Sequence, residues 1–133
     1  MGVFKTKMIV WNPAVGERAE EFDVWVDTGV AFSWLSRQRL EALGVRASRR
    51  VEFRTIEGHT IERELAPVFI RVDGYIGGDN VVMAEPGDLE VMGAHTLEAL
   101  AVAADPVHKK LLPIIPLALV ATLRRQRRRG GVP

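Results

Sequence analysis

The feature that most limits how this chain can fold is an alternating segment that ends in a carboxylate. From residue 22 to residue 26, every second side chain is a large apolar one, which is the period-two pattern of a half-buried strand. Asp27 follows directly, and the stretch 30–35 is again mostly apolar. Because a lone ionised carboxylate is costly to bury, Asp27 must be exposed, paired or protonated. The alternation predicts one face with Phe22, Val24 and Val26 and an opposite face with Asp23, Trp25 and Asp27.

Thr28 and Gly29 supply groups that can hold this carboxylate in a fixed orientation. Thr28 has a hydroxyl, and Gly29 has a backbone N–H that no side chain crowds. A second alternating segment, 4–11, precedes the strand and is joined to it by turn residues at 12–16. We therefore expect a hairpin whose second strand delivers Asp27.

The remaining sequence predicts short strands and two helices. Ser36 is expected to cap a helix over 37–43 that ends before Gly44, and Gly93 is expected to open a second helix. Glu57-Gly58 marks the tip of a long hairpin. Strands are expected at 51–55, 60–65, 67–72, 81–84, 89–92 and within 109–120, with turns at 73–74, 77–80, 85–88 and 105–106.

The two predicted helices carry a repeat. Residues 39–45 and 96–102 are identical at five of seven positions. Coincidence is one explanation, because Leu, Glu and Ala are common in helices. The other is an internal two-fold of two strand–glycine–helix halves, in which Gly29 and Gly93 have matching roles.

Val26-Asp27-Thr28-Gly29 resembles the active-site motif of the aspartic proteases, in the single-domain retropepsin-like form of bacteria and archaea. As in that family, a hydrophobic strand precedes the motif, and Ser33-Trp34-Leu35 follows it. Val91-Met92-Gly93 resembles the family's later hydrophobic-hydrophobic-Gly element. One departure is Val30, where the family usually has Ala or Ser, and this residue concerns substrate preference more than chemistry.

Two segments further along the chain, 97–100 and 105–107, resemble the end of the family's domain, so the resemblance runs from about residue 4 to residue 116. It implies an all-β fold with one or two short helices, in the form of a closed acid-protease barrel. It also implies the internal two-fold.

The resemblance further implies an aspartic endopeptidase that hydrolyses peptide bonds without a metal or cofactor. This chemistry needs two carboxylates, one as general base and one as general acid. Since the chain has a single Asp-Thr-Gly, a homodimer would supply Asp27 from each protomer. The implied roles are catalytic for Asp27, supporting for Thr28 and Gly29, and substrate-binding for Val30, Ala31, Ile56, Glu57 and Gly58.

The hairpin around Glu57-Gly58 has two interpretations. A polar hairpin with a glycine tip is typical of a mobile flap over a substrate, and it is equally typical of an ordinary edge hairpin. The apolar segments 4–10 and 111–120 are candidates for a contact between protomers. The segment 111–123 is too short for a membrane span and contains two prolines.

Composition sets the outer limits. The 133 residues are sufficient for one domain, expected over 1–120, and the absence of cysteine excludes disulfides, thiol nucleophiles and zinc–thiolate sites. No histidine spacing suggests a metal site, and without a signal-peptide pattern we expect a cytoplasmic protein. Five arginines lie in 124–129; removing them from the 18 basic residues leaves 13 against 17 acidic ones. We expect 121–133 to be a basic, disordered tail.

Three functions therefore stay open at the level of sequence. The first is the homodimeric aspartic endopeptidase, which depends on Asp27. The second is a peptide-binding dimer on the same fold that cleaves nothing. The third is a module that binds nucleic acid or anionic lipid through its arginine tail alone.

Overall fold

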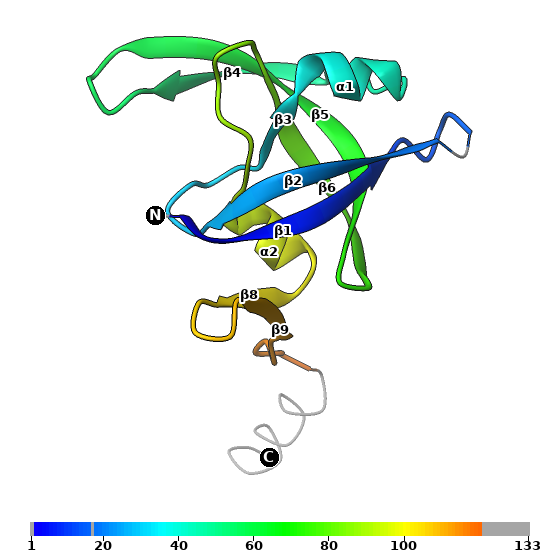
Figure 1. Ribbon diagram of the computed structural model, residues 1–133, viewed down its shortest axis with the longest axis vertical. Coiled ribbons are helices and arrows are strands. Elements are labelled where there is room, and N and C mark those ends of the chain that lie inside the picture. The colour runs from blue at the N-terminus through cyan, green and yellow to red at the C-terminus, as the bar shows by residue number, and fades with distance from the viewer. Residues whose placement is uncertain (1, 17, 121–133) are drawn as a thin grey trace, which may run out of the picture.

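The computed structural model describes residues 2–16 and 18–120 of the chain. Strands dominate it, and the two helices are short (Figure 1). The expectation of a mainly β fold with two short helices is confirmed. In chain order the elements are β1 (Gly2–Trp11), β2 (Ala19–Asp27), β3 (Trp34–Ser36), α1 (Arg37–Ala42), β4 (Arg49–Arg54), β5 (Thr60–Val72), β6 (Tyr75–Ala84), β7 (Val91–Met92), α2 (Ala94–Ala99), β8 (Val102–Asp105) and β9 (Lys110–Pro113).

Six strands form a ring. Hydrogen-bonded neighbours follow the order β1-β2-β7-β3-β6-β5, and β1 also pairs with β5, which closes the circuit. β4 continues the sheet beyond β5, and β8 and β9 form a separate two-stranded sheet. The strand that precedes Asp27 is built as its alternation predicts, with Phe22, Val24 and Val26 fully buried in a single hydrophobic core.

The pairing register contains an internal two-fold. β2 runs parallel to β7 with Val26 opposite Met92, and β6 runs parallel to β3 with Met83 opposite Leu35. A shift of 57 residues, from 26 to 83 and from 35 to 92, exchanges the two pairs. The same shift relates α1 to α2 and the repeat 39–45 to 96–102. The two-fold interpretation of the repeat is therefore confirmed.

The two-fold also corrects one expectation. It makes Gly93 equivalent to Ser36, so Gly29 and Gly93 do not have matching roles. Ser36 caps α1 as predicted, with its Oγ accepting the N–H of Arg39 at 3.3 Å. Gly93 begins α2 without any side-chain cap of its own.

Both helices dock through the repeated leucines. Leu40 and Leu43 of the first half are buried, as are their equivalents Leu97 and Leu100 of the second. Six residues are too few for a stable isolated helix, so this packing is what holds each one in place. Repetition of the buried positions explains why the sequence similarity is concentrated there.

Two interruptions that the sequence predicts between strands are absent from the structure. β5 continues from Thr60 to Val72 through Pro67, and the turn expected at 77–80 lies inside β6. Close packing explains Gly77: a Cβ there would lie 3.0 Å from both the Ala99 carbonyl oxygen and a methyl of Leu100. The glycine lets β6 pass against the end of α2 instead of marking a turn.

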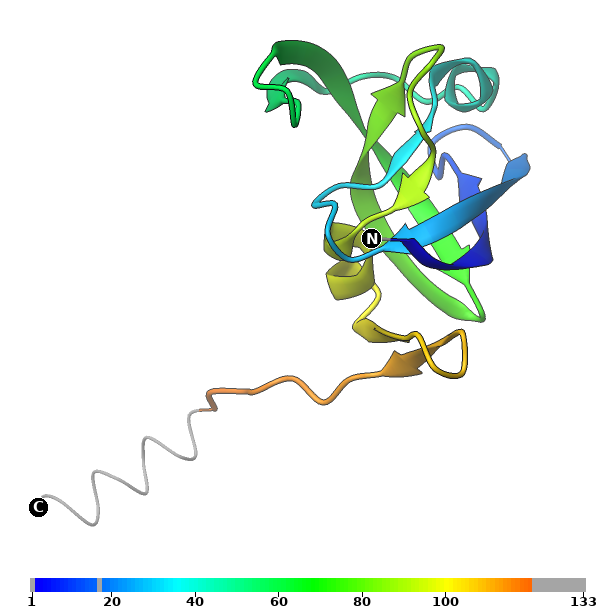
Figure 2. The same cartoon turned by 60° about the vertical axis from the view of Figure 1, so that its left-hand side comes forward.

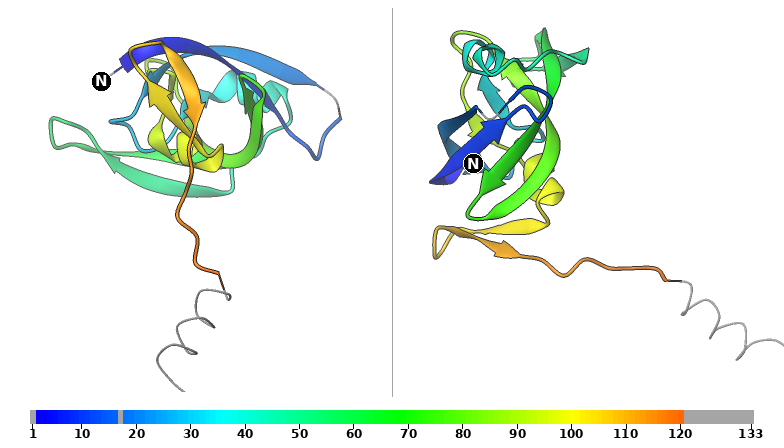
Figure 3. Two further views of the ribbon diagram at one scale, coloured as in Figure 1. Left: turned by 90° about the horizontal axis from the view of Figure 1, so that it is seen from below. Right: turned by 90° about the vertical axis from the view of Figure 1, so that its right-hand side faces the viewer.

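The chain leaves the ring after α2. Where the sequence predicts one or two final strands, β9 is formed only over Lys110–Pro113, paired with β8. The segment 114–120 has no regular structure and extends away from the body (Figure 2; Figure 3). The predicted arginine tail, 121–133, lies outside the described residues.

Within the part of the chain that the structure describes, no helix is both long enough and apolar enough to cross a membrane.

Candidate active site

Asp27 is the last residue of β2, at the point where the chain turns away from the sheet. It is partly exposed, so burial does not force its carboxylate to be neutral. Gly29 donates its N–H to Oδ1 of Asp27 at 3.0 Å, and Val30 donates to the Asp27 carbonyl at 3.2 Å. The turn after the strand therefore orients the carboxylate, as the sequence around Gly29 predicts. Thr28 and Gly29 themselves are exposed.

The segment that follows, 28–33, is fixed to the first turn of α2. Ala94 donates its N–H to the carbonyl of Val30, and His95 donates to the carbonyl of Ala31, both at 2.8 Å. Free N–H groups at the start of a helix need acceptors, and this loop provides them. We call residues 27–33 the Asp27 loop.

The start of α2 comes closest to the backbone of the Asp27 loop at Gly93. A Cβ at this position would lie 2.5 Å from the Phe32 carbonyl oxygen and 2.7 Å from that of Val30. Backbone atoms cannot move aside as a flexible side chain can, so only glycine fits. The sequence element Val91-Met92-Gly93 is thus placed directly against the Asp27 loop.

A buried row of polar groups lies behind the loop, and it does not follow from the sequence analysis. Ser33 Oγ accepts the Gly93 N–H at 3.0 Å and contacts Thr96 Oγ1, which donates to Asp79 Oδ2 at 2.6 Å. His95 Nδ1 lies 2.7 Å from Asp79 Oδ1. Asp79 falls in the segment that the sequence assigns to a turn, and no local pattern links it to Thr96 and His95, its partners in α2. His95 is exposed, as expected for a surface histidine.

The predicted flap is the β4–β5 hairpin. Its tip, Ile56–Gly58, is exposed, and Gly58 has a φ of +92°, which explains the glycine. Close behind the tip, where Phe53 pairs with Ile61, Phe53 of β4 packs against Phe32 at 6.0 Å and Trp34 at 5.1 Å between ring centroids. The hairpin is thereby anchored by aromatic contacts to the Asp27 loop and to β3, while its tip projects from the ring (Figure 1).

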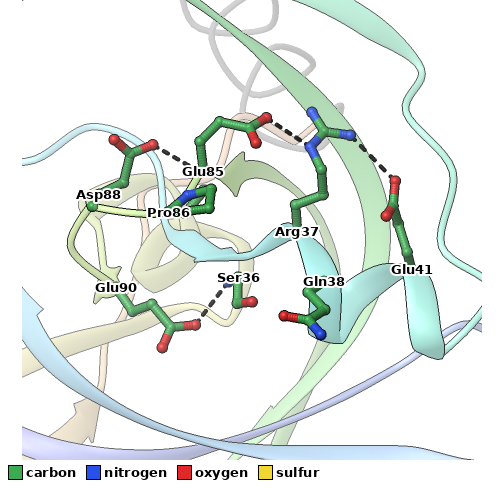
Figure 4. Close-up of a pocket in the computed structure, with 10 residues that line it drawn as sticks. Ser36, Arg37, Gln38, Glu41, Glu85, Pro86, Asp88 and Glu90 are labelled. Carbon is green, nitrogen blue, oxygen red and sulfur yellow. Dashed lines mark hydrogen bonds and ion pairs between the residues drawn. The ribbon is translucent and has the colours of Figure 1, made fainter.

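A hollow of about 420 Å³ lies between α1 and the loop 85–90 (Figure 4). Arg37 bonds Glu85 at 2.7 Å and Glu64 at 2.8 Å, and the Ser36 N–H donates to Glu90 at 2.7 Å. None of the predicted site residues lines this hollow.

Beside this hollow, Arg63 and Asp88 form a bidentate ion pair of 2.7 and 2.9 Å. The hydrogen bond from Arg63 lowers the pKa of the Asp88 carboxyl from its ordinary value. The acidic side chains around the hollow are therefore already bonded to neighbouring residues of the fold.

Among the described residues, no group of three or more histidine, aspartate or glutamate side chains could hold a metal ion. Neither models of known protein families nor curated proteins give a match to this chain.

Proposed function

We propose that this protein is an aspartic endopeptidase that works as a homodimer, with one Asp27 from each protomer. The observation that carries the proposal is Asp27 itself: a partly exposed carboxylate at the end of a buried strand, oriented by the Gly29 N–H at 3.0 Å. Its loop is fixed by backbone hydrogen bonds to α2, so the carboxylate sits on a rigid base. The resemblance of Val26-Asp27-Thr28-Gly29 to the aspartic protease motif adds to this argument.

The internal two-fold explains why a second copy is needed. Within one chain, the position equivalent to Asp27 is Ala84, a buried residue without a functional group. The second half therefore supplies no carboxylate at the matching position. A two-fold axis between two copies would bring Asp27 and its symmetry mate together at one place.

The proposed chemistry follows from two adjacent carboxyls. Two such groups about 3 Å apart do not both ionise readily, so they share one proton. The ionised one takes a proton from water, which attacks the peptide carbonyl. The protonated one polarises the carbonyl oxygen and later gives its proton to the leaving amine. Their apparent pKa values belong to the pair and not to either residue alone.

The substrate in this proposal is an extended peptide. Val30 and Ala31 would line the channel, and Ile56, Glu57 and Gly58 would close over it from the hairpin tip. A channel bounded by two copies would not be a pocket in one copy, and the hollow of Figure 4 does not have Asp27 in its lining. Thr28 would brace the two loops against each other across the axis.

The test is cleavage of a mixed peptide library by the wild type and by Asp27→Asn, from acidic to neutral pH. The substitution keeps the shape of the side chain and removes the charge. We expect the wild type to cleave and the variant to lose about a thousandfold or more in kcat/KM. Circular dichroism of both proteins checks that the fold is unchanged.

Other results point elsewhere. Equal cleavage by both proteins would remove Asp27 from the mechanism. Binding of peptides without cleavage, unaffected by Asp27→Asn, would favour the non-catalytic peptide-binding dimer. Salt-sensitive binding of nucleic acid or anionic vesicles that disappears when 124–133 is deleted would favour the tail-driven module.

A further inference from the structure

The buried polar row behind the Asp27 loop takes no part in the proposed chemistry. Ser33 and Thr96 are fully buried, and the Asp79 side chain is 2% exposed. Buried polar groups of this kind are costly unless each one is satisfied. Among the described residues, no buried side-chain nitrogen or oxygen lacks a partner.

The carboxylate of Asp79 determines the direction of every hydrogen bond in the row. An ionised carboxylate only accepts, so Thr96 must donate its one hydroxyl hydrogen to Oδ2. Thr96 Oγ1 can then only accept from Ser33, and Ser33 Oγ in turn accepts from the Gly93 N–H. One arrangement of hydrogens satisfies all four groups.

The other oxygen of the same carboxylate is also occupied. Asp79 Oδ1 accepts the N–H of Asn80 at 2.8 Å and lies 2.7 Å from Nδ1 of His95. The His95 ring in turn stacks on Phe32 of the Asp27 loop, with 5.3 Å between centroids. Asp79 thus holds two consecutive residues of α2, His95 and Thr96, on the strand β6.

Those contacts determine where the Asp27 loop lies. The first turn of α2 donates to the carbonyls of Val30 and Ala31, and Gly93 leaves no space for the loop to move closer. A displacement of α2 would therefore carry the loop with it. Through Thr96 and Ser33, Asp79 therefore fixes the position of the turn that orients Asp27.

Among the described residues of the other half, only one bond of the row has a counterpart: Glu90, at the position equivalent to Ser33, accepts the Ser36 N–H at 2.7 Å. The two-fold makes Phe22 equivalent to Asp79 and Arg39 equivalent to Thr96, and there the guanidinium of Arg39 lies 4.0 Å over the Phe22 ring. A cation–π contact on one side is replaced by a hydrogen-bonded carboxylate on the other. The row occurs in the half whose helix supports the loop bearing the proposed catalytic group.

We infer that Asp79 is a positioning residue for Asp27, acting through the hydroxyls of Thr96 and Ser33. The inference rests on the proposed protease function for its effect on turnover, but its effect on loop position does not. A positioning role predicts that turnover falls while substrate affinity is kept, because small misplacements of a reacting group slow the chemical step strongly.

The test compares Thr96→Val, which keeps the shape and removes the hydroxyl, with Thr96→Ser, which keeps the hydroxyl. Leu43→Ala is the control for general loss of stability, because Leu43 is buried in the other half, away from the row. The first measurement is amide hydrogen exchange by NMR. We expect exchange at Ala94 and His95 about tenfold faster in Thr96→Val than in Leu43→Ala, and unchanged in Thr96→Ser.

The second measurement is peptide cleavage per folded molecule. We expect kcat of Thr96→Val to fall about tenfold to a hundredfold with KM within about threefold, and Thr96→Ser to recover most of it. If Thr96→Val does not fold, Asp79→Asn replaces it, because Thr96 and the Asn80 N–H donate to different oxygens of Asp79 and an amide has only one oxygen.

The outcomes separate the inference from the proposed function. Selective exchange at Ala94 and His95 without any cleavage by the wild type would support the structural part of the inference and count against the protease. Exchange that is faster throughout the molecule to the same extent as in Leu43→Ala would overturn the inference. So would normal kcat in Thr96→Val when the wild type is active.

Discussion

At the scale of single residues, the internal two-fold exposes one unfavourable backbone conformation. Gly44 and Ala101 follow equivalent helices, and both have positive φ, 79° and 56°. Such a conformation is free for glycine but costs an alanine about 1 kcal/mol or more. One half of the molecule therefore ends its helix with the suitable residue and the other half does not.

Ala101→Gly is expected to stabilise the protein. Relief of the strained backbone exceeds the added entropy of the unfolded chain, so we expect a gain of about 0.5 kcal/mol, or about 2 °C in Tm. Gly44→Ala is the matched opposite: it creates the strain and places a Cβ 3.3 Å from Val15, so we expect a loss of about 1 kcal/mol. Urea unfolding of both variants measures the two changes. A loss in Ala101→Gly would contradict this explanation.

The contrast between Asp27 and Asp79 shows what a residue pattern can reveal. Asp27 ends an alternating strand and is followed by Thr28 and Gly29, so its structural environment can be predicted from adjacent residues. Asp79 follows two glycines and precedes Asn80, which is the composition of a turn. Its partners come from α2, and a contact between segments so far apart leaves no local pattern.

At the scale of elements, the hairpin between β4 and β5 is where a flap function can be tested. Ile56 is completely exposed at its tip, so its side chain contributes nothing to the stability of the protomer. An exposed apolar side chain at the tip of the hairpin is able to cover a ligand that lies beneath it. In the proposed function that ligand is the bound peptide.

Ile56→Ser is expected to raise KM or lower kcat/KM by about tenfold, because the contact of an apolar side chain with substrate is worth about 1–3 kcal/mol. Tm should stay unchanged. Ile76→Ser is the matched control, because Ile76 is also exposed but lies on the β5–β6 hairpin. Steady-state kinetics on one peptide tests both. Equal effects of the two substitutions would show that the hairpin is an ordinary edge.

Several elements could be predicted because their signals are local. Ser36 as a cap, Gly44 after α1 and Asp73-Gly74 between β5 and β6 all behave as their chemistry predicts. The strand through Pro67 and the glycines of β6 could not, because pairing and packing against α2 override the weak strand propensity of these residues. The closure of the ring through β1 and β5 likewise depends on contacts distant in sequence.

At the scale of the whole molecule, the apolar segments proposed for contact between protomers differ in availability. In β1, the side chains of Phe4, Met8 and Val10 are buried in the core of the protomer itself. The segment 114–120 is not covered: Ile115 and Leu117 are 99% and 95% exposed. It extends beyond the body of the molecule (Figure 2). If a second copy completes the site around Asp27, this segment is the part of the chain best placed to bind it.

Deleting residues 114–133 is therefore expected to weaken the dimer, whereas deleting only 121–133 should leave it intact. Each large apolar side chain that is buried on association contributes about 1.5–3 kcal/mol, so loss of the segment should raise the dissociation constant by at least about a hundredfold. The exposed segment supports nothing in the protomer, so circular dichroism should stay unchanged. Sedimentation equilibrium of the full chain and both truncated forms measures the association.

Cleavage should fall with the dimer fraction and return at high protein concentration, because each protomer supplies only one Asp27. A short form that stays dimeric would place the contact elsewhere, and a full chain that stays monomeric yet cleaves peptides would exclude the shared pair of carboxylates.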